Sequence, residues 1–169
     1  TYQGKEKLYD YYYNRFGLGK YTGIELAESK GTVIPPTDID GTNARYANMT
    51  FGQSLDLTMI QVATAFSAVV NGGDYYTPTL VAGEIKNGEF VRDVLKERDH
   101  QAIESSTSET MRKMLHTARL VFPNVKYYDE GVYVGGKTGT AQVVKNGKYT
   151  FDETIATYIG YGARSETDY

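Results

Sequence analysis

The chain has 169 residues, enough to bury one sizeable core, and because domains span roughly 100 to 200 residues we expect one domain or a large part of one. Its 18 basic and 21 acidic residues give a formal charge of -3 without long runs of one sign, which argues against binding to nucleic acid or to an anionic membrane surface. Cysteine is absent, which excludes disulfides and thiolate metal sites, and no stretch approaches 18 consecutive apolar residues.

The first half of the chain predicts two helices separated by a long loop. Apolar residues recur at helical spacing over about Gly4–Phe16, and glycines follow. The segment Tyr21–Asn48 is rich in glycine and proline and predicts an ordered loop. Thr58 and Gln61 have the spacing of a capping box, and the helix that they start should end at Asn71-Gly72-Gly73. Its predicted apolar face comprises Met59, Val62, Ala63, Phe66, Val69 and Val70.

A β-hairpin and a third helix are expected next. Asn87-Gly88 tolerates the positive φ angles of a type I′ turn and lies between two segments of strand character, Leu80–Lys86 and Glu89–Leu95. Ser106 and Glu109 then predict a capping box. The apolar side of this third helix would be Met111, Met114, Leu115, Ala118 and Phe122, with Pro123 at its end.

The last part of the chain predicts a second antiparallel pair. Val132–Val144 is rich in small and β-branched residues and precedes the turn dipeptide Asn146-Gly147. The segment Thr154–Tyr161 has strong strand propensity and would return beside it. We expect the chemistry of the protein on this pair.

One glycine-rich stretch matches the phosphate-binding loop of P-loop nucleotidases. Residues Gly131 to Thr138 fit the pattern G-x-x-x-x-G-K-[ST] letter for letter. That loop requires a buried strand before its first glycine and a helix that begins at its lysine. Here a short, partly charged segment precedes Gly131, and β-branched residues and a turn follow Lys137. A P-loop nucleotidase is therefore the less favoured enzyme hypothesis.

The same lysine also belongs to a second motif. Lys137-Thr138-Gly139-Thr140 resembles the K-T-G motif of penicillin-binding transpeptidases. Four further blocks, in the order of that family, are similar to its FGxGxxTGIDL, FGQ, TPxQLA and NGG segments: Phe16–Leu26, Phe51–Ser54, Thr58–Phe66 and Asn71–Gly73. The resemblance spans about Phe16–Gly162 and fits the class B, monofunctional branch best. It implies an α+β fold like that of the serine β-lactamases, with helices packed on an antiparallel sheet.

This resemblance also implies an activity and a role for each motif residue. Such proteins are peptidoglycan D,D-transpeptidases, whose serine attacks a stem peptide ending in D-Ala-D-Ala and which also bind β-lactams such as penicillin. Lys137 would be the cation near the serine, and the hydroxyls of Thr138 and Thr140 would hold the substrate carboxylate. Gly139 would keep the strand surface clear. The backbone N–H of Thr140 would form half of the oxyanion hole, and the strand edge would pair with the extended substrate. No cofactor or metal is expected.

The family's other two motifs have no convincing match. None of the seven serines begins an S-x-x-K motif, and S-x-N is also absent. Two segments, Tyr12–Asn14 and Tyr46–Asn48, match the variant Y-x-N, but their positions argue against that role. Residues 1–169 are therefore interpreted as an incomplete transpeptidase domain, truncated at both ends and inactive alone.

Three further expectations concern the location of the parent protein, the association of this chain with itself and an alternative function. The parent protein would sit in a bacterial cell membrane through a missing N-terminal anchor, with this domain on the extracytoplasmic side. The unpaired sheet edges of the fragment predict that it dimerises or exchanges elements between copies. The alternative function is a non-catalytic module that binds β-lactams or stem peptides without turnover.

Overall fold

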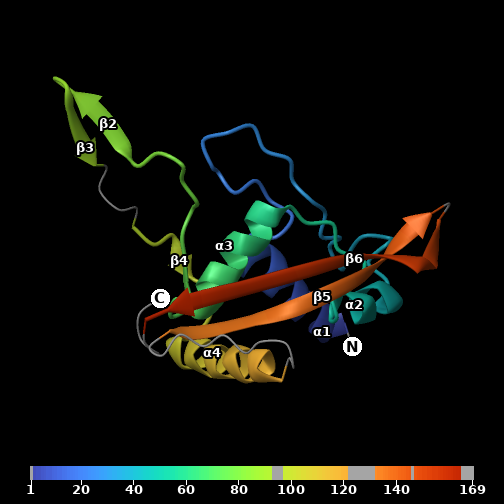
Figure 1. Ribbon diagram of the computed structural model, residues 1–169. Helices are drawn as coiled ribbons and strands as arrows, with labels where there is room; N and C mark the ends of the chain where they lie inside the picture. Colours follow the sequence, from blue (N-terminus) through green and yellow to red (C-terminus); the bar gives the residue numbers. More distant parts are fainter. Residues whose placement is uncertain (1, 93–96, 122–131, 146, 165–169) are drawn as a thin grey trace. The chain divides into compact units, whose positions relative to one another are not determined.

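A computed structural model describes residues 2–92, 97–121, 132–145 and 147–164 (Figure 1). The elements belong to two compact units, Thr1–Glu104 and Ser105–Tyr169. The α+β class is confirmed, because helices accompany three antiparallel strand pairs. The assignment of residues 1–169 to one incomplete domain stays a prediction. Within the described ranges, no helix combines the length and the apolar character that a membrane span requires.

The first unit begins with the predicted helix, which has a widened last part. Helix α1 covers Tyr2–Tyr9 and continues into the π-helix η1, Asp10–Arg15. The widening appears in the backbone, where the amide of Phe16 donates to the carbonyl of Tyr11, five residues earlier, at 2.9 Å. The apolar side of this helix packs on the core of the unit, which contains Leu18, Val33, Tyr46, Met49 and Ala65.

Helix α2, Asn43–Met49, occupies the end of the segment Tyr21–Asn48 that was predicted to be a loop and ends one residue beyond it. The prediction was wrong here because the glycines and prolines that motivated it end at Gly41. Beyond them, the hydroxyl of Thr42 accepts from the backbone N–H of Arg45 at 3.2 Å and caps the helix. Tyr46 and Met49, three positions apart on one face, are both buried in the core.

Helix α3 runs over Met59–Val70, and the predicted capping box of Thr58 and Gln61 is present. Its predicted apolar face is wrong at Met59, Val62 and Ala63, which are exposed. Met59 is 90% exposed, whereas Gln61 is 1% exposed. The small residues Thr64, Ala65 and Ala68 bring the helix close to its neighbours, and the Gln61 amide donates to the carbonyl of Lys20. Close approach and a buried hydrogen bond, and not the size of the apolar side chains, therefore select the buried face. Of the other predicted residues, Val70 is buried, and Phe66 and Val69 are half-buried.

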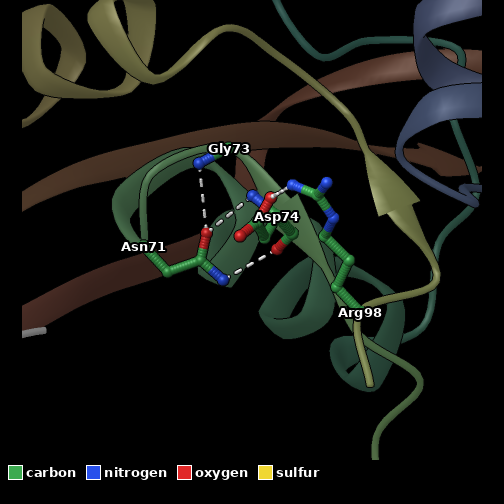
Figure 2. A network of polar contacts seen from close by, with 4 residues as sticks. All are labelled: Asn71, Gly73, Asp74 and Arg98. Atoms are coloured by element: carbon green, nitrogen blue, oxygen red, sulfur yellow. Dashed lines mark hydrogen bonds and ion pairs between the residues drawn. The ribbon is translucent and has the colours of Figure 1, made fainter. Parts of the chain in front are cut away.

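The turn after α3 is held by side chains, as Figure 2 shows. The Asn71 side-chain oxygen accepts from the backbone amides of Gly73 and Asp74 at 3.2 and 3.0 Å, and its amide donates to the Asp74 carbonyl at 2.7 Å. Arg98 forms an ion pair with Asp74. A Cβ on Gly73 would lie 2.0 Å from the carbonyl oxygen of Ile103, so no larger residue fits there. The predicted end of α3 is confirmed.

Two short antiparallel pairs complete the first unit. Strand β1, Asp74–Tyr75, pairs with β4, His100–Gln101. Strands β2, Gly83–Lys86, and β3, Glu89–Arg92, form the predicted hairpin, which projects from the rest of its unit (Figure 1). The turn dipeptide Asn87-Gly88 has φ angles of 53° and 84°, as a type I′ turn requires. The hairpin is confirmed, but its first strand begins at Gly83 and not at Leu80. The predicted residues 93–95 lie outside the described residues.

The second unit consists of one helix and one long β-ribbon. Helix α4 covers Ser105–Leu120. The predicted cap at Ser106 is wrong, because the helix begins one residue earlier and Ser106 lies inside it. The predicted Phe122 and Pro123 lie outside the described residues. On the predicted apolar side Leu115 is buried, but Met114 is 60% exposed.

The ribbon pairs β5, Tyr133–Lys145, with β6, Lys148–Ala163 (Figure 1). The predicted antiparallel pairing is confirmed. Strand β5 is shifted by one residue from the predicted Val132–Val144, and β6 extends beyond the predicted Thr154–Tyr161 at both ends. Lys137 stands in the middle of β5, opposite Ile159. Because a strand runs where a phosphate-binding loop needs the start of a helix, the P-loop hypothesis is wrong.

Candidate active site on strand β5

The two glycines before Lys137 make room for aromatic rings of the neighbouring strand. A Cβ on Gly135 would lie 2.4 Å from a ring carbon of Tyr161, and one on Gly136 would lie 2.2 Å from the hydroxyl oxygen of Tyr158. Such distances exclude any side chain unless the rings move. The residues that match a phosphate-binding pattern therefore serve the packing of this ribbon.

The motif residues divide between the two faces of the ribbon. Successive side chains of a strand alternate, and directly paired residues share a face. Lys137 and Gly139 thus share a face with Tyr161, whose hydroxyl donates to a carbonyl of α4, that of Arg112, at 3.0 Å. Thr138 and Thr140 lie on the opposite face. The lysine and the two hydroxyl groups can therefore act on one ligand only at the edge of β5, where both faces meet.

One backbone contact identifies the residues of β5 that face β6. The carbonyl oxygen of Gly135 lies 3.0 Å from the Cβ position of Gly160 in β6, so it points across the ladder. In an antiparallel pair, residues whose N–H and C=O both face the partner strand alternate with residues whose groups face away. Lys137 and Gly139, two and four positions after Gly135, therefore direct their backbone groups toward β6.

The alternating residues Val134, Gly136, Thr138 and Thr140 present their backbone groups at the opposite edge. Two side-chain contacts agree with this assignment. Nδ1 of His116 lies 2.7 Å from the carbonyl oxygen of Val134, and Nζ of Lys137 donates to the carbonyl oxygen of Thr138 at 2.8 Å. Among the strands that the structure describes, β5 pairs with β6 alone. The lysine ammonium group and the amide of Thr140 therefore share an edge that can accept another extended chain.

The surface around Lys137 is open. Lys137, Thr138 and Thr140 are all exposed. A Cβ on Gly139 would lie 2.6 Å from the hydroxyl oxygen of Thr157, so a larger residue would push against β6 on the face that carries Lys137. The site thus offers a cation, two hydroxyl groups and a backbone donor without burying any of them.

Sequence reasoning missed several residues around this strand. Thr157 pairs with Gly139, and Tyr158 pairs with Thr138. These neighbours follow from the register of the ladder, which the sequence alone does not give. His116 lies within the predicted third helix and belongs to no motif, so no local signal in the sequence identified it. No group of three or more potential metal ligands occurs in the part of the chain that the structure describes.

The two Y-x-N segments are structural. The hydroxyl of Tyr12 donates to the carbonyl of Met49 at 3.0 Å, and that of Tyr46 donates to the carbonyl of Ile34 at 2.7 Å. Tyr46 is also buried in the core. Both tyrosines are therefore engaged in holding the first unit together, which supports the interpretation of these matches as chance.

Comparison with family models gives one description for nearly the whole chain. Residues 3–169 match the model of the penicillin binding protein transpeptidase domain. This range includes both units and all the sequence blocks named above.

Individual proteins agree with this match. The chain is 38% identical over 161 residues to stage V sporulation protein D of Bacillus subtilis, covering 94% of this chain and 24% of that protein. It is 26% identical to the probable peptidoglycan D,D-transpeptidase PenA of Neisseria meningitidis serogroup A, over 94% of this chain and 25% of PenA. A crystal structure of penicillin binding protein 3 from Mycobacterium tuberculosis with aztreonam has a TM-score of 0.78 at 28% identity, covering 96% of this chain and 38% of the other. The chain spans about a quarter of the length of the curated relatives it matches.

Proposed function

The chain belongs to the penicillin-binding protein transpeptidase family, and we propose that it is the lysine-bearing part of a class B peptidoglycan D,D-transpeptidase. The reaction is acyl transfer in two steps. A serine hydroxyl adds to the carbonyl of the penultimate D-alanine, and the bond to the terminal D-alanine breaks. An amine of a neighbouring strand then takes the acyl group and releases the serine. The serine lies outside this chain, because none of its serines begins an S-x-x-K motif.

Lys137 supplies the positive charge of the proposed site. Its ammonium group lies at the edge of β5 and donates to the carbonyl of Thr138. A compact charge at this edge can lower the free energy of the deprotonated serine network and attract the carboxylate of the substrate. The exposed position of Lys137 supports this role, since a ligand can reach it without a rearrangement of the fold.

Thr138, Gly139 and Thr140 form the substrate-binding part of the site. The two hydroxyl groups are proposed to hold the terminal carboxylate, and the backbone N–H of Thr140 to stabilise the oxyanion of the tetrahedral intermediate. The observation that carries the proposal is the common edge of Lys137 and the Thr140 amide, together with the family match. Gly139 leaves the space beside Lys137 open.

The proposed partners are stem peptides ending in D-Ala-D-Ala and β-lactam antibiotics. Aztreonam and ampicillin are bound in crystal structures of the similar penicillin binding protein 3. The proposed location is the extracytoplasmic side of a bacterial cell membrane, where peptidoglycan is assembled. The open edge of β5 also favours pairing between copies of this chain, and small-angle X-ray scattering that finds a compact monomer would contradict that expectation.

Covalent labelling with a fluorescent penicillin tests the proposed function. The label is applied to this chain and to the longer protein that contains the upstream motifs. We expect labelling of the longer protein alone. Labelling of neither protein would indicate a module that binds β-lactams or stem peptides without turnover, and labelling of this chain would place a nucleophile within it.

A further inference from the structure

The free edge of β5 has two halves that differ in how their backbone carbonyls are bonded. The carbonyl of Val134 lies 2.7 Å from a histidine nitrogen of α4, and that of Thr138 accepts from Nζ of Lys137 at 2.8 Å. Further along the strand, at Thr140 and Gln142, no side chain of the described residues bonds to the backbone. The edge from Thr140 onward therefore offers its backbone groups to an extended chain without a competing bond.

Gln142 continues this open half of the edge. It pairs with Thr154 in the same unbroken register in which Thr140 pairs with Ala156. Because backbone groups alternate in direction along a strand, the N–H and C=O of Gln142 face away from β6, as those of Thr140 do. Gln142 thus adds a second backbone donor and a second acceptor roughly 7 Å along the edge from those of Thr140.

The regular ladder ends directly after Gln142. Between its pair and the next one, Val144 with Tyr149, lie one residue of β5 and four residues of β6. In this irregular part the hydroxyl of Thr150 donates to the carbonyl of Val143 at 3.1 Å, so this carbonyl points toward β6 as the alternation requires. Extra residues in one strand of a pair bend the strand and increase its twist. A straight extended chain that follows the edge through Gln142 therefore separates from β5 beyond it.

The proposed chemistry decides which part of a peptide reaches Gln142. With the carbonyl of the penultimate D-alanine at the amide of Thr140 and the terminal carboxylate at Thr138, the rest of the peptide runs antiparallel to β5, toward Gln142. In an antiparallel pair, residues that exchange both hydrogen bonds recur every two residues on each strand. Thr140 then pairs with the penultimate D-alanine, and Gln142 pairs with the residue two positions before that D-alanine.

We propose that Gln142 is a further substrate-binding residue, whose backbone N–H and C=O bond to the residue two positions before the penultimate D-alanine. The bend after Gln142 makes this the last peptide residue that β5 recognises. The inference rests on the proposed function, because it takes the reactive carbonyl to lie at the amide of Thr140. The substrate is then a peptide with at least two residues before D-Ala-D-Ala, whereas a penicillin is too short to make these bonds.

Two variants separate the backbone of Gln142 from its side chain. Gln142→Pro removes the N–H, and a strand tolerates proline where the N–H faces away from the partner strand. Gln142→Ala keeps the N–H and removes the rest of the side chain. Both are made in the longer transpeptidase that contains this chain, and acylation by a penicillin reports whether the remainder of the site is intact.

A series of peptide thioesters measures how far along β5 the substrate is recognised. Each carries D-alanine on a thiolactate leaving group and has an N-acetyl group, with zero, one, two or three glycines between the two. The first glycine brings the acetyl carbonyl to the N–H of Gln142, and the second brings an N–H to its C=O. In the unaltered protein we expect each of these steps to speed acylation about 3- to 10-fold, the worth of one hydrogen bond, and the third glycine to change it less than about 2-fold.

The variants should respond differently to the first glycine. Gln142→Pro should lose the gain in rate that this glycine gives, whereas Gln142→Ala should keep it, and penicillin should acylate both within about 2-fold of the unaltered protein. The same gain in Gln142→Pro, or a further gain from the third glycine, would overturn the proposal. If Gln142→Pro does not fold, as judged by loss of penicillin acylation, the glycine series in the unaltered protein decides.

The penicillin control also distinguishes the failure of this inference from that of the proposed function. A longer protein that does not react with penicillin at all would contradict the proposed function. Normal acylation by penicillin, together with peptide acylation that does not depend on the number of glycines, would overturn only the role of Gln142.

Discussion

The two units use the residues of their family-like blocks in opposite ways. In the first unit Gln61 is buried and its amide group is bonded on both sides, to the backbone N–H of Thr58 and to the carbonyl of Lys20. In the second unit Lys137 and Thr140 are exposed on a strand edge. The block that contains the buried Gln61 stabilises the fold, whereas the block that contains Lys137 leaves polar groups available to a ligand. Burial therefore distinguishes motif residues with a structural role from those that can contact a substrate.

The two histidines make the same pair of contacts in the two units. His100 stacks on Tyr75 at 5.0 Å, and its Nε2 lies 2.8 Å from the carbonyl of Arg15 at the end of η1. His116 stacks on Tyr133 and bonds to the Val134 carbonyl. The carbonyl at Arg15 belongs to a helix end, where an orphan acceptor needs a partner. The carbonyl at Val134 belongs to a strand, at the edge of β5 that faces away from β6.

The largest expected effect is on the chemistry of the second unit. Lys137→Ala in the longer transpeptidase should slow acylation by penicillin about 100- to 1000-fold, the scale on which loss of one charge-stabilising group acts in an active site. The free energy of unfolding should change by less than about 0.5 kcal/mol, since the residue is exposed. Stopped-flow acylation and urea unfolding measure the two. Lys145→Ala, in the same strand and also exposed, is the matched control and should acylate normally. An unchanged rate of penicillin acylation in Lys137→Ala would contradict the role assigned to this lysine.

The largest stability effect is expected in the first unit. Gln61→Leu should lower the free energy of unfolding by about 2 to 3 kcal/mol, because it leaves the buried partners at Thr58 and Lys20 without their bonds. Urea unfolding of this chain, followed by circular dichroism, measures the change. Gln101→Leu, at an exposed position of β4, is the control and should shift stability little. Equal effects of the two substitutions would mean that burial of the motif residue does not matter.

Tyr46 should make stability depend on alkaline pH. Burial, with a smaller effect from Tyr9, raises its pKa to about 12. The folded state then keeps the phenol neutral while the unfolded chain ionises near its ordinary pKa of about 10, so the free energy of unfolding should fall between about pH 10 and 12.

The variant Tyr46→Phe tests this assignment. Its free energy of unfolding should be about 1 kcal/mol lower at neutral pH, because the hydrogen bond to Ile34 is gone, and should decline less at alkaline pH. Urea unfolding at several pH values tests this. The same pH profile in Tyr46→Phe as in the unaltered chain would contradict the assignment, and Tyr21→Phe, at an exposed tyrosine, is the control.

The smallest expected effect concerns Glu28. Burial tends to raise the pKa of this carboxyl group, but hydrogen bonds from Thr22, Gly23 and Ile24 outweigh it and lower the pKa. A lowered pKa contributes stability that is present above the pKa of the unfolded chain and is lost as the pH falls through the folded-state value. Glu28→Gln should therefore flatten the acid side of the stability profile. Acid titration followed by fluorescence measures it, with Glu104→Gln as an exposed control; identical profiles for Glu28→Gln and the unaltered chain would refute the role of this loop contact.

Local signals in the sequence predicted much of the fold. The start and end of α3 follow from Thr58, Gln61 and Asn71, whose side chains bond to backbone groups within three residues of themselves. The type I′ turn follows from Asn87-Gly88, because few other dipeptides tolerate two positive φ angles. Lys137 was predicted to lie in a strand, because β-branched residues and a turn follow it and no helix can begin there.

The predictions that failed depended on long-range contacts. The buried face of α3 was wrong because the partner of Gln61 lies 41 residues away, at Lys20. Helix α2 was missed because two buried residues and one cap overcame the apparent loop character of its surroundings. In both cases tertiary packing outweighed the local pattern.

For the candidate site, the sequence by itself determined the motif Lys137–Thr140, its strand and its family resemblance. Only the tertiary structure decided which residues share a face, which edge carries the ammonium group, and which side chain of α4 bonds to that edge. The physical reason is that a strand has no fixed partner until the ladder forms. Register, and with it the neighbours of every side chain, comes from packing between segments that are far apart in the chain.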